Sequence, residues 1–184
     1  IRQQMYAEPD VIAEPGGKRL DQLRGEVTFR NVKFSYEPGV PVLKGFNLPV
    51  QAGQTVALVG ETGCGKSTIT NLIYRFYDPD SGVVEVDGVD LKDLDVGWYR
   101  RRVATVPQDP VVFDTTLREN LAFGRRGATD QQLREALNAA ELGELIERLP
   151  DGLETMVGDE GVQLSVGEKQ RLCIARAMLA DPRI

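Results

Sequence analysis

Residues 60–67 have the types and the spacing that a loop needs to bind phosphate groups. They are Gly60, Glu61, Thr62, Gly63, Cys64, Gly65, Lys66 and Ser67, and Thr68 follows them. Phosphate oxygens must come close to a row of backbone N–H groups, so the glycines keep side chains out of the way. Lys66 supplies a positive charge for the terminal phosphates, and the Ser67 hydroxyl can join the ligand shell of Mg²⁺. We therefore expect a phosphate-binding loop here, with an ordinary glycine-rich turn as the alternative.

Cys64 stands at a variable position of this loop and has two interpretations. It is either an interchangeable small residue or a reactive thiol, because a helix N-terminus beside Lys66 stabilises a thiolate. On the second interpretation, alkylation of Cys64 blocks nucleotide binding. Cys173 lies far away in the sequence, so we expect no disulfide and a reducing compartment.

A second stretch with possible chemistry is 164–171, with the sequence Leu-Ser-Val-Gly-Glu-Lys-Gln-Arg. Ser165 and Glu168 have the spacing of a capping box, which satisfies free N–H groups at the start of a helix. Apolar residues then repeat at helical spacing, namely Leu172, Ala175 and Leu179. By itself this pattern predicts only a capped helix with one buried face.

Short strands and a helix must position the phosphate loop. An alternating apolar pattern begins at Glu26 and changes face at Arg30 and Asn31, which predicts a strand with a bulge. The β-branched run 55–59 predicts a strand that is buried on both faces and leads directly into the loop. After the loop, apolar residues at helical spacing predict a helix; they are Ile69, Leu72, Ile73 and Phe76.

Further along the chain the pattern indicates a hairpin, one more strand and then helices. Alternating valines before an Asp-Gly turn at 87–88 predict the hairpin, and the apolar run 103–106 predicts the strand. Residues 117–123 predict a helix, and Thr129 with Gln132 predicts a capping box that opens the next one. A β-rich first half therefore leads into a helical insert.

Composition is typical of a soluble globular domain and argues against a role on nucleic acid. Of the 184 residues, 41% are hydrophobic and 27% charged, and the longest apolar runs are far too short to cross a bilayer. Acidic residues number 28 against 22 basic ones, and this net charge of −6 disfavours a nucleic-acid surface. Any membrane role is therefore expected to come from a partner.

The phosphate loop and the capped helix together resemble the nucleotide-binding domains of the ATP-binding-cassette (ABC) family. Residues 60–68 resemble its Walker A motif, residues 106–110 its Q-loop and residues 164–171 its signature segment. The resemblance extends over the chain from about Gly25 onward. It implies an α/β fold, a P-loop NTPase core with an antiparallel β subdomain and a helical subdomain, and places the C-terminal part of that core after Ile184.

The resemblance also implies roles for individual residues. Tyr36 resembles the aromatic residue that stacks on adenine, with a core or strand-face tyrosine as the alternative. Gln108 is implied as a catalytic residue with Lys66, as a Mg²⁺ ligand with Ser67 and as a link to the transmembrane partner; a surface-loop amide is the alternative. The signature segment is implied to contact nucleotide through Ser165, Gly167 and Glu168.

Several segments resemble the exporter branch of the family. They are residues 157–161, residues 113–120, and a linker over residues 1–24 like one that follows a transmembrane domain. The ABC domain is expected over 25–184, with the helical insert at about 109–162. Because the chain has no initiating Met and stops just after Pro182, we expect it to be a piece of a longer protein.

The implied function is transport across a membrane, driven by ATP and Mg²⁺. The implied partners are a second ABC domain, identical or different, which sandwiches ATP head to tail, and transmembrane domains of the same transporter. No nucleic acid is expected, and the expected location is the cytoplasmic face of the cell membrane.

The signature segment departs from the family pattern at two positions. Val166 replaces the first of two successive glycines, and Glu168 stands where glutamine is common. We expect the valine to obstruct a phosphate and the carboxylate to repel it. The Walker B aspartate, the glutamate that polarises water and the switch histidine are all expected after Ile184. This piece is therefore expected to bind nucleotide but not to hydrolyse it alone.

Other functions are compatible with part of the pattern. One alternative is a soluble ABC-type ATPase that acts on DNA or ribosomes, and another is a regulatory module that binds nucleotide without turnover. A P-loop kinase or GTPase would leave the signature-like helix unexplained.

Overall fold

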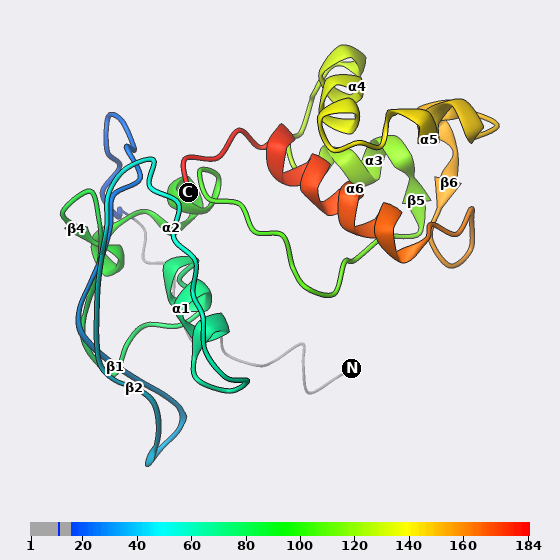
Figure 1. Cartoon of the computed structure of the whole chain (residues 1–184). Coiled ribbons are helices and arrows are strands. Elements are labelled where there is room, and N and C mark those ends of the chain that lie inside the picture. The colour runs from blue at the N-terminus through cyan, green and yellow to red at the C-terminus, as the bar shows by residue number, and fades with distance from the viewer. Residues whose placement is uncertain (1–10, 12–15) are drawn as a thin grey trace. The chain divides into compact units, whose positions relative to one another are not determined.

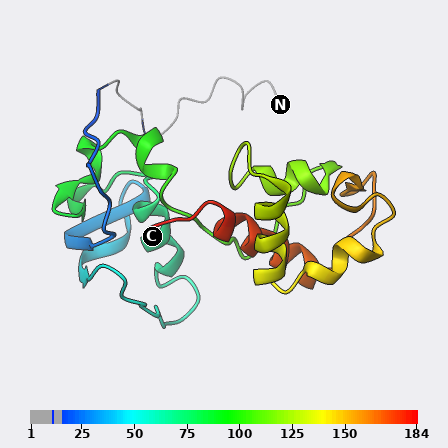
Figure 2. The ribbon, with the colours of Figure 1, turned by 90° about the horizontal axis from the view of Figure 1, so that it is seen from above.

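The computed structural model describes residue 11 and residues 16–184, and it divides into two compact units. Most of the linker predicted over 1–24 therefore lies outside the described residues. The first unit comprises the described residues up to Val103 together with Arg183 and Ile184, and the second comprises residues 104–182. Figures 1 and 2 show the ribbon of both units in two views. No helix among the described residues combines the length and the apolar character that a bilayer crossing needs.

The first unit contains a four-stranded antiparallel sheet. Its order is β2-β1-β3-β4, with β1 at Val27–Glu37, β2 at Val40–Val50, β3 at Ser81–Val86 and β4 at Val89–Asp90 (Figure 1). The predicted bulge is confirmed, because the β1–β2 register shifts between Phe29 and Val32 and Asn31 has a φ of 47°. The predicted hairpin is also confirmed, with positive φ at both turn residues between β3 and β4.

Side chains of the sheet and of two helices share one core in this unit. The helices are α1 (Lys66–Ile73) and α2 (Val96–Arg100), and a 3₁₀ turn, η2 (Leu91–Asp93), lies between β4 and α2. Phe29, Leu72 and Tyr99 are almost completely buried there. The Tyr99 hydroxyl donates a hydrogen bond to the Ile73 carbonyl at 2.7 Å, and burial raises the pKa of this phenol, so it stays protonated and keeps donating.

Two of the strand predictions are wrong. Residues 55–59 and 103–106 have no regular secondary structure, and Val59 is 93% exposed although its run was expected to be buried on both faces. An apolar run of this kind becomes a strand only where neighbouring strands satisfy its backbone N–H and C=O groups. Among the described residues no strand pairs with either run. The residue types are those of an inner strand, but in the part of the chain that the structure describes no neighbouring strand pairs with them.

The second unit is mainly helical, as predicted. It contains α3 (Leu117–Ala122), α4 (Asp130–Ala139), α5 (Gly143–Arg148), η3 (Gly152–Glu154) and α6 (Val166–Leu179), with a small sheet of β5 (Thr115–Thr116) and β6 (Met156–Val157). Helices α3 and α4 pack against α6 (Figure 1). The core between them is aliphatic and includes the expected stripe of Leu172, Ala175 and Leu179. Both predicted capping boxes are confirmed, at Thr129–Gln132 for α4 and at Ser165–Glu168 for α6.

Candidate functional site

The predicted phosphate loop runs directly into α1, so the helical half of its expected setting is confirmed while the strand before it is not formed. Gly65 caps the helix with a left-handed φ of 96°, where a Cβ would lie 3.1 Å from Leu43 Cδ2. A Cβ on Gly60 would come within 2.7 Å of the Cys64 sulfur. Both positions therefore need glycine for this backbone path, in agreement with the sequence argument.

The Lys66 side chain folds back over the loop from the first turn of α1. Its ammonium donates to the carbonyls of Gly60 at 2.8 Å and Glu61 at 2.7 Å, and the Cys64 sulfur lies 3.7 Å from it. The positive charge is thus held directly at the loop, next to the exposed thiol of Cys64. A lysine ammonium has three donors, so this arrangement can exchange its carbonyl partners for phosphate oxygens.

Tyr36 lies beside the first turn of the same helix. Its hydroxyl donates to Thr68 Oγ1 at 3.2 Å and accepts from the Asn71 amide at 3.2 Å. Phe34 and Tyr77 pack edge-on against its ring, which remains 48% exposed. The structure therefore brings Tyr36 to the predicted loop, as a strand residue with part of its ring free; contact with adenine stays a prediction.

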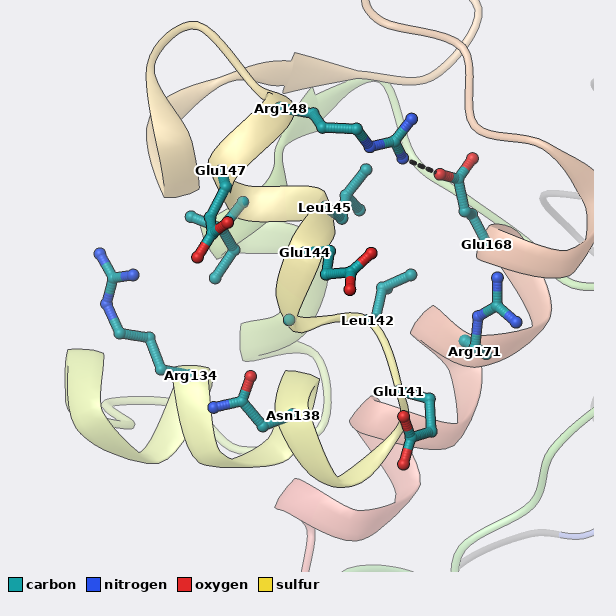
Figure 3. A pocket seen from close by; sticks show the side chains of 12 residues that line it. Arg134, Asn138, Glu141, Leu142, Glu144, Leu145, Glu147, Arg148, Glu168 and Arg171 are labelled. Carbon is teal, nitrogen blue, oxygen red and sulfur yellow. Dashed lines mark hydrogen bonds and ion pairs between the residues drawn. The ribbon is translucent and has the colours of Figure 1, made fainter.

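The start of α6 carries the second set of predicted residues. Ser165 Oγ accepts from the Glu168 N–H at 3.3 Å, while the Ser165 N–H and hydroxyl both donate to Glu168 Oε2 at 2.8 Å. Arg148, at the end of α5, pairs with the other carboxylate oxygen of Glu168 (Figure 3). The hydrogen bonds from Ser165, and then Arg148, hold the pKa of Glu168 below its usual range, so it is a carboxylate at neutral pH.

Gln108 lies exposed in the irregular segment that opens the second unit. It shares that unit with Ser165, Gly167 and Glu168, whereas Tyr36 and residues 60–68 belong to the first unit. The predicted site residues are therefore distributed over both units. Val166, which replaces a family glycine, is 72% exposed beside Ser165.

Two arginines near these residues were not predicted. Arg176 on α6 donates to the backbone carbonyls of Val111 and Asn120, and it lies over the Phe113 ring at 5.6 Å, so it fixes the segment that follows Gln108. A charged residue next to the buried stripe of α6 was the available signal for it. No sequence pattern pointed to Arg148, because its partner Glu168 is 20 residues away on another helix.

A family model described as "ABC transporter" matches residues 43–184 of this chain. The chain belongs to the ABC transporter family. Within that family it is 47% identical over 180 residues to ABC transporter B family member 21 of Arabidopsis thaliana, covering 96% of this chain and 14% of that protein. It is 46% identical over 170 residues to multidrug resistance protein pgp-1 of Caenorhabditis elegans, covering 91% of this chain and 13% of that protein.

A solved structure of the ABC transporter family supports the same assignment. A bacterial Atm1-family ABC exporter with ATP bound matches with a TM-score of 0.90 and 40% identity, over 98% of this chain and 32% of that one. The expected α/β ABC ATPase fold and the resemblance to exporter-type nucleotide-binding domains are confirmed. The chain spans less than a third of the length of each of these three relatives.

Proposed function

We propose that this chain is the domain of an ABC exporter that binds Mg-ATP through residues 60–68. The observation that carries the proposal is the position of the Lys66 ammonium, held over the loop by the carbonyls of Gly60 and Glu61 at the start of α1. A cation and a helix N-terminus at the same place favour a polyphosphate. Family membership and the ATP-bound relative support the same ligand.

The residues assigned to Mg²⁺ carry oxygen donors, which are the ligands that this ion prefers. Ser67 offers a hydroxyl and Gln108 an amide oxygen, both on exposed residues, and Mg²⁺ in nucleotide sites takes few protein ligands besides phosphate oxygens and water. When bound, the ion neutralises charge on the phosphates. Lys66 positions the terminal phosphates, and Tyr36 supplies a partly free ring for the base.

The start of α6 is proposed to meet the terminal phosphate of ATP bound to a second ABC domain. A capped helix N-terminus presents N–H groups and a favourable dipole to an anion. ATP then favours the closed pair of domains because the pair binds it better than either domain alone, and hydrolysis lets the pair open. We propose that transmembrane domains of the full-length protein follow this cycle, at the cytoplasmic face of the membrane and without nucleic acid.

Hydrolysis is proposed for the full-length protein and not for residues 1–184 alone. The alternatives of a soluble ABC-type ATPase and of a non-hydrolysing regulatory module are less favoured. The relatives reported above include a B-family member, a multidrug resistance protein and an exporter, and this pattern favours ATP-driven transport.

Replacing Lys66 by alanine tests the proposal. We expect Lys66→Ala to weaken binding of the fluorescent analogue TNP-ATP to the full-length protein by at least about tenfold, because it removes a charged hydrogen-bond donor to phosphate. Lys92→Ala is the matched control, since Lys92 is an exposed lysine of the same unit on η2. Equal affinity of the wild type and Lys66→Ala would contradict the assignment of the loop.

A further inference from the structure

We propose that Arg148 is a positioning residue for the signature segment. It holds the Glu168 carboxylate on the side of α6 and offsets its charge, so that the start of the helix accepts a terminal phosphate despite the acidic residue there. This inference rests on the proposed function, and it adds a residue from outside all the motifs that the sequence singled out.

The two oxygens of Glu168 have different partners. Oε2 accepts from the N–H and the hydroxyl of Ser165, both at 2.8 Å, so this oxygen belongs to the helix cap. Oε1 pairs with the guanidinium of Arg148. The cap therefore fixes where the carboxylate lies, and Arg148 supplies its opposite charge.

Arg148 reaches Glu168 from a different helix. It is the last residue of α5, and Figure 3 shows its side chain extending toward the first turn of α6, where the Glu168 side chain is only 15% exposed. Both residues line a pocket of about 690 Å³. Arg171, Arg134 and the acidic residues Glu141, Glu144 and Glu147 also line this pocket, but only Arg148 pairs with Glu168 among the described ion pairs.

The charge of residue 168 affects how strongly the start of α6 binds an anion. The helix dipole and the free N–H groups favour a phosphate, whereas an uncompensated carboxylate within the first turn opposes it. A neutral glutamine would need no partner, but Glu168 does. Replacing Arg148 should therefore weaken ATP binding only while residue 168 carries a charge. If Arg148 instead contacted the phosphate directly, its replacement would weaken binding whatever residue stands at 168.

A double-mutant cycle in the full-length protein tests the proposal. The measured quantity is the KM for ATP in steady-state hydrolysis, for the wild type, Arg148→Ala, Glu168→Gln and the double variant. We expect Arg148→Ala to raise KM roughly threefold to fivefold, the range of a partly exposed ion pair. In the Glu168→Gln background the same change should leave KM almost unaltered. Arg148→Lys, with Glu168 in place, should have a KM close to that of the wild type.

Arg134→Ala is the matched control, because it removes an arginine from the same pocket that does not pair with Glu168. An equal rise of KM for Arg148→Ala in both backgrounds would overturn the proposal, since Arg148 would then act by direct contact or through stability. Thermal unfolding of each variant identifies a stability effect. TNP-ATP binding that depends on Lys66 tests the proposed function separately. If that binding is normal but Arg148→Ala leaves KM unchanged, only the role of Arg148 is contradicted.

Discussion

Asn120 shows at the residue scale how buried polar groups hold the second unit together. Its side chain is completely buried, and its amide nitrogen donates to the carbonyls of Phe113 at 2.9 Å and Thr116 at 3.0 Å. Its oxygen accepts from the Phe113 N–H at 3.0 Å and from Arg176. A single amide thus ties the segment after Gln108 to both α3 and α6.

We expect Asn120→Ala to lower the local unfolding free energy of α6 by about 2–3 kcal/mol, because the buried carbonyls and the Arg176 guanidinium lose their partner. Hydrogen exchange of the α6 amides in the full-length protein measures this. Asn138→Ala, at an exposed position of α4, should change it by less than about 0.5 kcal/mol. Equal effects of the two substitutions would show that Asn120 does not organise the unit.

Sequence reasoning predicted the roles of the loop residues but not the contacts that Asn120 and Arg148 make. The sequence identifies Gly60, Gly65 and Lys66 because their roles depend on the local backbone path and on their spacing, which can be read from the sequence. Asn120 and Arg148 depend on partners that only tertiary packing brings to them. No local pattern distinguishes such residues from ordinary surface polar groups.

At the element scale, α4 and α6 begin with the same kind of capping box but differ in proposed role. Thr129 and Gln132 cap α4, and Ser165 and Glu168 cap α6, each with reciprocal hydrogen bonds. Both were predicted, because a cap is set by residues three apart in the sequence. The two helices therefore allow the structural effect of a cap to be separated from an effect on nucleotide.

We expect Ser165→Ala and Thr129→Ala each to cost about 1 kcal/mol of stability, since each removes one N-cap acceptor. Only Ser165→Ala should also raise the ATP concentration needed for half-maximal hydrolysis, because only α6 is proposed to meet the terminal phosphate. Thermal unfolding and KM of both variants check this. A similar KM for the two variants would argue against α6 as the phosphate-facing helix.

The strands show where prediction by element fails. Strand β1 and the β3–β4 hairpin were anticipated because their residues alternate and pair within the chain. Residues 55–59 and 103–106 have equally strong apolar patterns but find no paired strand among the described residues. Strand propensity reflects how well a segment packs between neighbouring strands. It therefore predicts a strand wrongly where no neighbouring strand pairs with the segment.

At the scale of the whole molecule, the residues proposed to contact nucleotide belong to two different units. The first holds residues 60–68 and Tyr36, and the second holds Gln108 and the start of α6. The family and the α/β class were readable from motif order, since three motifs in sequence are far more specific than any one of them. The relatives are longer proteins, and this chain matches only part of each.

The central claim is that backbone amides of residues 60–68, with the Lys66 ammonium, surround the phosphates of ATP. Hydrogen–deuterium exchange of the full-length protein with and without Mg-ATP tests it most directly. We expect slower exchange across residues 60–68 on addition of Mg-ATP, and no slowing there in Lys66→Ala at the same concentration. Unchanged exchange over residues 60–68 at saturating Mg-ATP in the wild type would contradict it.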